Sequence, residues 1–523
     1  MLCRALLHGR MESDYMSKHG KGKSPRILIV TPEITYLPAG MGNMANHLTA
    51  KAGGLADVSA SLVSALFGLG ADVHVALPHY RRMFNIDVGK FISEELLAYK
   101  SKLPRDRIHL AEDRIFYYRD QVYEQGLHDA LKLALAFQRE VINNIIPLVK
   151  PDLIHCNDWM TGLVPAMARR LGIPCLFTVH NIHTHNITLD VIEDNGIDAA
   201  EFWHNLYYMN YAGNYEETRY NNPVDLLTSG IFASHYINTV SPTFLHEVAD
   251  GHHAFVPPQV RNEVANKVIS GCAAGILNAV DSGSNPENDQ YLVENYGPKD
   301  HADAKRKNKL ALQEHLGLIQ DADAPIFFWP SRLDPVQKGC QLLADILYNV
   351  VSKYWDDKLQ FVMVANGSYQ EHFHNIVRWH DLHERVAVCD FHERLSHRAY
   401  AASDFLLMPS LFEPCGLPQM VSCIYGSLPI ARNTGGLHDT VSMLDIDNNS
   451  GNGFLFNDYD SNALFWAIDR AMDFYHQPEN VKSEQIERIM VESRAQFNHT
   501  VTAEAYFKIY EDMLQRPLIK RQR

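Results

Sequence analysis

The sequence is poor in cysteine, and its few thiols are not grouped. Eight cysteines occur in 523 residues, and no two of them form a CxxC pair. Zinc sites of that type and thioredoxin-like redox motifs are therefore unsupported. Most of the cysteines stand in apolar runs such as PCLFTV and RVAVCD, where a reduced, buried thiol is the expected state. This usage favours a reducing compartment, and we expect a cytoplasmic protein.

Long apolar runs and an excess of positive charge are also missing. No stretch of about 18 consecutive apolar residues occurs, so the sequence predicts no membrane span. Lys and Arg number 47 against 62 Asp and Glu, a net charge of −15. Nucleic acids and anionic membrane surfaces need a basic footprint, so we predict neither as a partner. A local basic cleft for a small anionic molecule remains compatible with this total.

Glycine and proline are not enriched, at 30 and 24 residues, and the hydrophobic fraction of 46% is ordinary for a globular protein. Single cores stop growing at roughly 250–300 residues, so this chain is expected to form at least two domains. Residues 1–25 lack the apolar segment and small-residue cleavage site of a targeting peptide. We interpret them as a flexible tail, or as the product of a start codon upstream of Met11 or Met16, with a short targeting peptide as the less favoured alternative.

Short β-rich runs alternate with helical patterns along the rest of the chain. The first series includes RILIVTPE, ADVHVALP, DLIHCND, PCLFTVHN and HYINTVSP, and the second includes APIFFWPSR, KLQFVMVANGS, RVAVCDF, DFLLMPS and SLPIARN. Strands separated by helices predict parallel βαβ units, and hence two consecutive doubly wound α/β domains. A polar stretch between the two series places the domains at 26–290 and 291–523. Ligands in such sheets bind beyond the carboxyl ends of the strands, so the informative residues should follow each strand.

Two segments predict contacts to an anion. KAGGLADV places Lys51 and two glycines directly before a helix, where backbone N–H groups and the helix terminus favour negative charge. A simple tight turn is the alternative, and the glycine spacing supports neither a dinucleotide fold nor a Walker ATPase. SRLDPVQKG follows a strand and offers Arg332 and Lys338 as a diphosphate clamp, with solvated surface charges as the alternative.

Two later segments complete the pattern. In PSLFEPCGLPQM, Glu413 follows a strand and Gly416 opens a helix, so the carboxylate is placed to accept hydrogen bonds from sugar hydroxyls. The alternative is a charge that stabilises the start of the helix. NTGGLHDTV carries a second glycine pair before a helix and echoes KAGGLADV, as two similar domains would.

Together these motifs resemble those of the bacterial glycogen synthases and plant starch synthases, glycosyltransferase family 5. KAGGLADV, HCNDWMTGL, TVHN, TVSPTF, GILNAVD, SRLDPVQKG, FEPCGLPQ and NTGGLHDTV occur in the family's order. The resemblance implies a GT-B fold, in which two Rossmann-like domains face a central cleft that holds the active site, with C-terminal helices packing back on the N-terminal domain. It also implies transfer of glucose from ADP-glucose to the 4-hydroxyl of an α-1,4-glucan, with retention.

The resemblance assigns roles to particular residues. In the first domain, Lys51, Gly53 and Gly54 resemble the loop at the donor, Asp57 a carboxylate needed for activity, Asp158 and Trp159 the acceptor side, and His180 and Asn181 the segment at the glucose. Asn278, near the end of the first domain, matches the GILN asparagine. In the second domain, Arg332 and Lys338 match the diphosphate pair, Glu413 the glucose-binding carboxylate, and Phe391 an aromatic residue that stacks on the base. Cys415, Gly416, Leu417, Thr434, Gly435 and Gly436 belong to the donor-binding motifs, and Asp439 is left without a role. His180, Asp158, Arg332, Lys338 and Glu413 are the expected catalytic set.

The sequence departs from the family in three places. Arg332 and Lys338 are separated by one residue more than is usual, Pro418 replaces a residue with an N–H donor, and the loop before Lys51 is longer. A proline in the first turn of a helix is harmless, because its N–H would have no helical partner there.

The expected chemistry needs neither a metal nor a cofactor, since cations and helix termini can neutralise the departing diphosphate. Two alternatives stay open at this point. One is a related retaining GT-B enzyme that uses UDP-glucose or another acceptor. The other is a catalytically weak glycan-binding homologue, against which the intact Lys51, His180, Arg332, Lys338 and Glu413 count.

Overall fold

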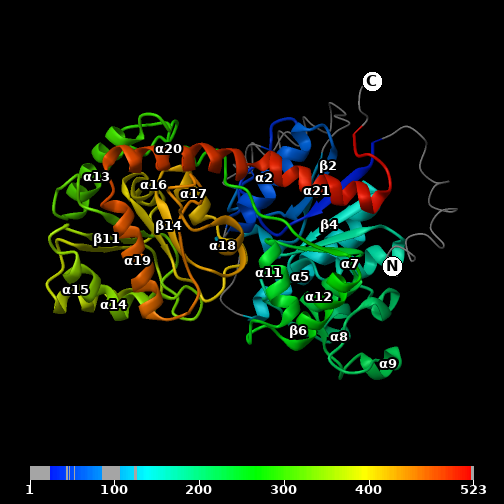
Figure 1. Cartoon of the computed structure of the whole chain (residues 1–523). Helices are drawn as coiled ribbons and strands as arrows, with labels where there is room; N and C mark the ends of the chain where they lie inside the picture. Colours follow the sequence, from blue (N-terminus) through cyan, green and yellow to red (C-terminus); the bar gives the residue numbers. More distant parts are fainter. Residues whose placement is uncertain are drawn as a thin grey trace. The chain divides into compact units, whose positions relative to one another are not determined.

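The computed structural model describes residues 24–42, 45, 48–51, 54–84, 107–122 and 127–519. Contacts within the chain divide it into two units, each built on a parallel sheet with flanking helices (Figure 1). The first unit comprises Met1–Val240, Leu245–Ile276 and His499–Arg523, and the second comprises Ser241–Phe244 and Leu277–Asn498. Residues 277–290, assigned to the first domain from the sequence, therefore make their contacts within the second unit.

The first unit contains a seven-stranded sheet in the order β3-β2-β1-β4-β5-β8-β9, in which all neighbours are parallel. Its strands are β1 (Arg26–Val30), β2 (Asp72–Pro78), β3 (Ile108–Ala111), β4 (Leu153–Asn157), β5 (Cys175–Val179), β8 (Tyr236–Thr239) and β9 (Ala273–Gly275). A separate antiparallel pair is formed by β6 (Asn186–Ile187) and β7 (Val224–Asp225). The strand runs read from the sequence are thus confirmed, because each buries a continuous apolar stretch between layers of helices.

Helices connect these strands. They are α2 (Gly54–Gly68), α4 (Arg114–Tyr117), α5 (Leu127–Glu140), α6 (Ile146–Val149), α7 (Val164–Leu171), α8 (Leu189–Asp194), α9 (Tyr215–Thr218), α10 (Leu226–Ala233), α11 (Pro242–Asp250), α12 (Pro258–Ile269) and, far along the chain, α21 (His499–Leu514). A short π-helix, η2 (Val141–Ile145), joins α5 to α6, and the 3-10 turns are η3 (Trp159–Thr161), η4 (Ala199–Glu201) and η5 (Trp203–Asn205). Among the described residues, no helix combines the length and the apolarity needed to cross a membrane.

The second unit contains a six-stranded parallel sheet in the order β12-β11-β10-β13-β14-β15. Its strands are β10 (Ile326–Trp329), β11 (Gln360–Val364), β12 (Val386–Cys389), β13 (Phe405–Met408), β14 (Leu428–Arg432) and β15 (Phe454–Phe456). Its helices are α13 (His301–Leu316), α14 (Cys340–Lys353), α15 (Gln370–Trp379), α16 (Glu393–Ala402), α17 (Pro418–Ile424), α18 (Gly435–Thr440), α19 (Ser461–Tyr475) and α20 (Glu479–Gln496).

Both faces of this second sheet are covered by helices. Phe327 and Trp329 of β10 point into a core shared with α14 and α19, whereas Ile326 and Phe328 point into a core shared with α13 and α16. Because side chains alternate along a strand, one short strand supplies both cores. The fold is therefore the predicted pair of doubly wound α/β units, as in GT-B proteins.

The last helix, α21, is held to the first sheet by a buried polar chain. Tyr510 donates its hydroxyl to His155 Nδ1 at 2.7 Å, and His155 Nε2 lies 2.6 Å from Thr178 Oγ1. The Thr178 hydroxyl donates to Asn238 Oδ1, and Asn238 Nδ2 donates to the Tyr506 hydroxyl at 2.9 Å. This order assigns the His155 proton to Nε2. Burial lowers the pKa of His155 to about 3, so the ring stays neutral.

Candidate functional site

The residues predicted for the second unit follow the carboxyl ends of four strands. Arg332 and Lys338 follow β10, Phe391 follows β12, Glu413 follows β13 and Thr434 follows β14. Strands β10, β13 and β14 are consecutive neighbours in the sheet, so their loops share one edge. This is the edge at which open α/β sheets bind ligands.

Lys338 and Glu413 form a sheltered ion pair. Lys338 Nζ donates to Glu413 Oε2 at 2.5 Å, and the Ser410 hydroxyl donates to the same oxygen at 3.2 Å. Their side chains are only 12% and 9% exposed. Removing one partner of such a pair leaves a buried charge without compensation, which is strongly destabilising. The sequence predicted both residues for the site, but not that they contact each other.

Gly339 explains why these two side chains meet. Its φ is +71°, and a Cβ there would lie 2.1 Å from the Pro409 carbonyl oxygen. Leu411 also donates its N–H to the Gln337 carbonyl at 2.8 Å. The loop after β10 is thus pressed onto the loop after β13 with no room for a side chain, and this contact fixes the pair.

Arg332 differs from Lys338 in being open to solvent. Its side chain is exposed, and its guanidinium forms no ion pair with any residue that the structure describes. The segment between the two cations is a turn, in which the Lys338 N–H donates to the Asp334 carbonyl at 3.0 Å. An exposed guanidinium beside a sheet edge is suited to bidentate binding of phosphate.

The FEPCGL and TGGL segments lie against each other. Gly436 donates its N–H to the Glu413 carbonyl at 2.9 Å, and a Cβ at Gly436 would lie 2.1 Å from the Cys415 carbonyl oxygen. Two predicted donor-binding segments, Cys415, Gly416 and Leu417 on one side and Thr434, Gly435 and Gly436 on the other, are therefore brought together. Burial raises the pKa of the Cys415 thiol to about 12, so it is no nucleophile.

Gln419 fastens these segments, and sequence reasoning missed it. Its buried amide nitrogen lies within 3.1 Å of the Cys415 and Gly416 carbonyls and 2.9 Å from Thr440 Oγ1. A polar residue one position into an apolar helix was the available signal. Helix α17 begins at Pro418, two residues after the Gly416 start expected from the sequence, and the missing N–H in its first turn costs no helical hydrogen bond.

Phe391 presents its ring to solvent. The side chain is 56% exposed, and its N–H donates to Asn366 Oδ1 at 2.8 Å. The alternative of a core phenylalanine is therefore wrong, whereas stacking on a nucleobase remains a prediction. Asn366 follows β11 in the same way that the other site residues follow their strands, so its position after a strand was an available signal.

Asn278 and Asp439 each form hydrogen bonds to another segment of the second unit. The Asn278 N–H hydrogen-bonds the Cys415 thiol, and Asn278 Oδ1 is buried with no donor among the described residues. The Asp439 carboxylate accepts the Thr243 N–H at 2.8 Å and the Thr243 hydroxyl at 2.7 Å. Asp439, which the sequence left without a role, therefore fastens the TVSPTF segment to the TGGL helix.

In the first unit, Asp158 organises the segment after β5. It has a φ of 56°, and its carboxylate accepts the His180 N–H at 2.8 Å and the Asn181 side-chain amide at 3.1 Å. Burial raises the pKa of Asp158 to about 7, with the charge of Glu33 adding to the effect. This carboxyl group therefore titrates near neutral pH, which is typical of functional sites.

Glu33 is a residue of the first unit that sequence reasoning missed. It is buried directly after β1, in the TPE turn, and it lies close enough to Asp158 to disfavour that residue's charge. A carboxylate directly after a strand was the signal.

His180 is neutral and has a defined tautomer. Burial lowers its pKa to about 3. Its Nε2 lies 2.9 Å from Asn157 Oδ1, while Asn157 Nδ2 donates to the Val30 carbonyl at 3.1 Å. Because this second bond fixes the orientation of the amide, Nε2 of His180 carries the proton. Trp159 is buried edge-on against His185, with 4.3 Å between ring centroids, so its predicted contact with the acceptor remains a prediction.

Lys51 is a half-exposed cation held at the start of α2. Its Nζ lies 2.9 Å from Asp57 Oδ2, and the Thr35 hydroxyl donates to Asp57 Oδ1 at 2.6 Å. Gly54 is the first residue of the helix, and the predicted Gly53 lies outside the described residues.

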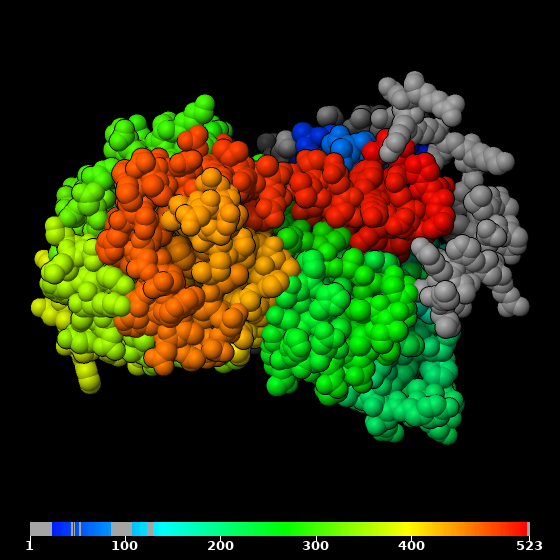
Figure 2. Space-filling view, viewed as in Figure 1, coloured from blue at the N-terminus to red at the C-terminus, as the bar shows by residue number. Residues whose placement is uncertain are grey.

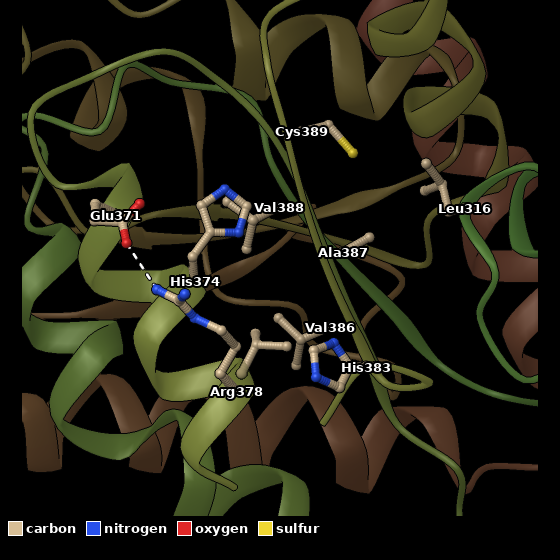
Figure 3. A pocket seen from close by; sticks show the side chains of 10 residues that line it. Leu316, Glu371, His374, Arg378, His383, Val386, Ala387, Val388 and Cys389 are labelled. Atoms are coloured by element: carbon tan, nitrogen blue, oxygen red, sulfur yellow. Dashed lines mark hydrogen bonds and ion pairs between the residues drawn. The ribbon is translucent and has the colours of Figure 1, made fainter. Parts of the chain in front are cut away.

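Pocket volume does not by itself locate this site. A pocket of about 470 Å³ lies at the edge strand β12, beside α15, and contains none of the predicted residues (Figure 3). Within it, Arg378 donates to Glu371 at 2.7 Å. Another pocket, of about 520 Å³, includes Asn433 and Asn457, which directly follow β14 and β15. Asn433 also directly precedes the predicted Thr434.

Comparison with known proteins gives a consistent result. Residues 26–256 match the family of the starch synthase catalytic domain, and residues 324–473 match the glycosyl transferases group 1. The glycogen synthase of Exiguobacterium sibiricum is 33% identical over 88% of this chain and 95% of its own length. That of Alkaliphilus metalliredigens is 31% identical over 88% of this chain and 97% of its own.

A solved structure extends the similarity to three dimensions. The catalytic domain of starch synthase IV from Arabidopsis thaliana, bound to ADP and acarbose, is 26% identical with a TM-score of 0.74. The match covers 94% of this chain and all of that one, 100%. The resemblance read from the motifs is thereby confirmed. The chain belongs to the glycogen and starch synthase family, glucosyltransferases of the GT-B fold that elongate an α-1,4-glucan.

Proposed function

We propose that the donor is ADP-glucose and that glucose passes, with retention, to the terminal 4-hydroxyl of an α-1,4-glucan. The observation that carries the proposal is the cluster of Arg332, Lys338 and Glu413 at neighbouring strand ends. The similarity to a starch synthase that was solved with ADP supports adenine as the base.

In the second unit, the cationic side chains of Arg332 and Lys338 neutralise the negative charge of the departing diphosphate. Arg332 binds phosphate oxygens bidentately, and Lys338 acts as a point charge beside them. Glu413 accepts hydrogen bonds from glucose hydroxyls and favours positive charge on the sugar. Such preorganised electrostatics are typically the largest contribution to a rate enhancement. Phe391 stacks on the base.

In the first unit, neutral His180 offers its backbone carbonyl to the positive charge that develops at the anomeric carbon. Its ring orientation is kept by Asn157, and its backbone by Asp158. Lys51 adds a cation for the donor. The acceptor attacks from the face on which the diphosphate leaves, and the leaving phosphate takes the proton of the acceptor hydroxyl.

We propose a cytoplasmic location from the state of the cysteine side chains. Among the described residues six cysteines are free, namely Cys156, Cys175, Cys340, Cys389, Cys415 and Cys423, whereas Cys272 is disulfide-bonded. The predominance of free thiols supports a cytoplasmic enzyme, and the disulfide at Cys272 counts against it.

The test is transfer with matched donors. The protein is incubated with glycogen and either ADP-glucose or UDP-glucose, and release of the nucleotide diphosphate is followed, with donor alone as the control. We expect faster release from ADP-glucose, and a product that α-1,4-specific amylases degrade. Faster release from UDP-glucose would overturn the donor assignment, and acceptor-independent release would overturn the transfer.

A further inference from the structure

A small pocket lies at the edge of the second sheet that is opposite to the predicted donor site. Phe405 and Leu428, which begin β13 and β14, line this pocket, whereas Glu413 and Thr434 follow the ends of the same two strands. The other walls are α13, the end of α19 and the first turn of α20. Figure 1 shows α13 beside α20, and in Figure 2 the orange-red surface of α20 adjoins green surface in this region. The volume of about 70 Å³ is sufficient for a few waters or one small ion.

The charged side chains around this pocket do not balance. Each of its three carboxylates has a cationic partner: Arg306 pairs with Asp323 at 2.5 Å, Lys309 with Asp404 at 2.7 Å, and Lys482 with Glu479 at 2.9 Å. Lys305 is a fourth cation in the lining, and it forms no ion pair with any residue that the structure describes. With His301 counted as neutral, the pocket therefore has one more positive charge than it has negative charges.

The extra charge, that of Lys305, is buried. Its Nζ donates to the carbonyls of Ala401 at 3.0 Å, Ser403 at 2.8 Å and Tyr425 at 3.1 Å, at the carboxyl ends of α16 and α17. Carbonyl dipoles at helix ends favour a cation, but they do not neutralise it. Because a charge that is removed from water without a counter-charge is costly, an anion in the pocket would stabilise the protonated side chain.

The pKa of Lys305 agrees with this imbalance. Burial lowers it to about 7, while Asp404 opposes the shift and Lys309 adds to it. Tyr296, whose ring centroid lies 6.0 Å from the Lys305 Nζ, stays neutral because burial raises its pKa. Burial also lowers the pKa of His301, so this ring is neutral above its ordinary pKa of 6.5. An anion that binds here above pH 7 should therefore bring a proton onto Lys305.

The walls of the pocket also retain proton donors for an anion. Lys309 uses one proton on the Ala324 carbonyl at 2.9 Å and one on Asp404, and Lys482 uses one on Glu479. The remaining protons of these two ammonium groups have no acceptor among the residues that the structure describes. Helix α20 begins without a side-chain cap, so the N–H groups of the turn that lines the pocket also favour negative charge.

We propose that this pocket, called here the lysine pocket, binds one small oxyanion with the charge and shape of sulfate or phosphate. Lys309 and Lys482 donate hydrogen bonds to the ion, and Lys305 contributes its charge from the buried floor of the pocket. The volume leaves no room for an organic substituent, so the ligand is the free ion. Glu479, exposed at the rim, repels an anion and lowers its affinity. Because the ion binds between α13 and α20, it stabilises the folded second unit.

The test is calorimetric titration of the whole protein with sulfate, whose protonation does not change near neutral pH, at an ionic strength held constant with chloride. Lys482→Met is compared with Lys353→Met. Like Lys482, Lys353 lies over a tyrosine ring, 5.3 Å from the Tyr354 centroid, and pairs with a carboxylate, Asp469 at 2.8 Å, but it is outside the pocket. We expect one sulfate per chain for the parent and the control, and an affinity about tenfold lower or worse for Lys482→Met. Glu479→Gln should bind sulfate more tightly than the parent, because it removes the repelling charge at the rim.

A second readout is the number of protons taken up with the ion, measured by repeating the titration in buffers that differ in ionisation enthalpy. At pH 8 the parent and Lys353→Met should take up a fraction of a proton, because the anion raises the pKa of Lys305. Lys305→Arg should bind sulfate without this uptake, since arginine is already protonated. Uptake by Lys305→Arg equal to that of the parent would place the proton elsewhere and would overturn the assignment of this pocket.

Absence of saturable sulfate binding by the parent would overturn the lysine pocket, and so would equal affinities of Lys482→Met and Lys353→Met. Neither result depends on whether a variant of the buried Lys305 folds. Inorganic phosphate and glycerol phosphate distinguish a free ion from an ester. The free ion should bind as sulfate does and the ester more weakly, whereas tighter binding of the ester would overturn the assignment to a free ion. Because no donor or glucan is present, failure of the transfer assay would contradict the proposed function without affecting this result.

Discussion

The same five-residue pattern occurs once in each unit, in KAGGLADV and NTGGLHDTV, with different consequences. Asp57 and Asp439 occupy equivalent positions, and each accepts a threonine hydroxyl, from Thr35 at 2.6 Å and from Thr243 at 2.7 Å. The second oxygen of Asp57 pairs with the cation of Lys51, whereas that of Asp439 accepts a backbone N–H. The aspartate of the motif thus holds a threonine in both units, and only in the first unit does its other oxygen pair with a cation.

The glycines of the two motifs also differ in exposure to solvent. Gly54 is exposed at the start of a 15-residue helix, where its backbone is open to an approaching anion. Gly436 is buried against Cys415 at the start of a six-residue helix. For the second unit we therefore propose that the charge for the donor comes from Arg332 and Lys338, both on the loop after β10, and the following variants test this division.

The largest effect is expected at Lys338 and Glu413. Lys338→Ala and Glu413→Ala should each lower kcat by about 10²–10³, the scale for removing one preorganised electrostatic group. Because the pair is sheltered, each single change should also lower the melting temperature, by leaving an unpaired charge. Steady-state kinetics and thermal unfolding of both variants measure the two effects.

A double variant separates the two effects. Lys338→Met/Glu413→Gln carries no unpaired charge, so its melting temperature should recover while kcat stays low. Recovery of kcat together with stability would show that the pair only holds the loops together. Retention of more than about a tenth of the parent kcat by Lys338→Ala would likewise contradict its role at the phosphates.

A smaller effect is expected at Phe391. Phe391→Ala should raise the KM for the donor with little change in kcat, because base stacking is mostly uniform binding. The loss should be about 1–3 kcal/mol, as for base stacking on aromatic side chains elsewhere. Trp379→Ala, which removes an indole 85% exposed in the same unit, is the control. A donor KM equal to that of the control would refute stacking.

The two aspartates should separate function from stability. Asp439→Ala removes two hydrogen bonds to Thr243 and should lower the free energy of unfolding by about 1–3 kcal/mol, with KM values unchanged. Asp57→Asn frees Lys51 and should instead raise the donor KM, with a stability change of at most about 1 kcal/mol, since the pair is partly exposed. If the two variants show the same profile, the contrast between the motifs is wrong.

The smallest effect is the pH dependence of stability in the first unit. The pKa of Asp158 is raised from 3.8 to about 7, so its contribution to stability falls as pH rises through this range and is level above it. The pKa values of His155 and His180 are lowered from 6.5 to about 3, so their contribution to stability increases as the pH rises between those two values. The melting temperature of Asp158→Asn, relative to that of the parent, should therefore increase as the pH is raised from 4.5 to 7.5. A difference that is constant with pH would contradict the raised pKa.

The sequence predicted the position of a site residue wherever its type and its place after a strand were enough to identify it. Arg332, Lys338 and Glu413 were placed correctly after their strands, because parallel sheets expose all carboxyl ends at one edge. The Lys338–Glu413 contact could not be foreseen, since it depends on how closely Gly339 approaches Pro409 in another loop. The shifted pKa of Asp158 depends on burial, which no local pattern reports.

Residues that join loops were missed for the same reason. Gln419 and Asn366 act through partners distant in sequence, and amides at such positions look like ordinary polar residues.

The attachment of α21 to the first sheet has a consequence for biosynthesis. His155 and Asn238 can meet Tyr510 and Tyr506 only after residues 277–498 of the second unit have been synthesised. Domains generally fold in order from the amino terminus during translation. Here the amino-terminal unit has to wait, with uncapped polar groups and uncovered apolar surface, while the unit encoded after it already has all of its strands. The residues of the second unit are thus all synthesised before α21, which follows them in the chain and completes the first unit.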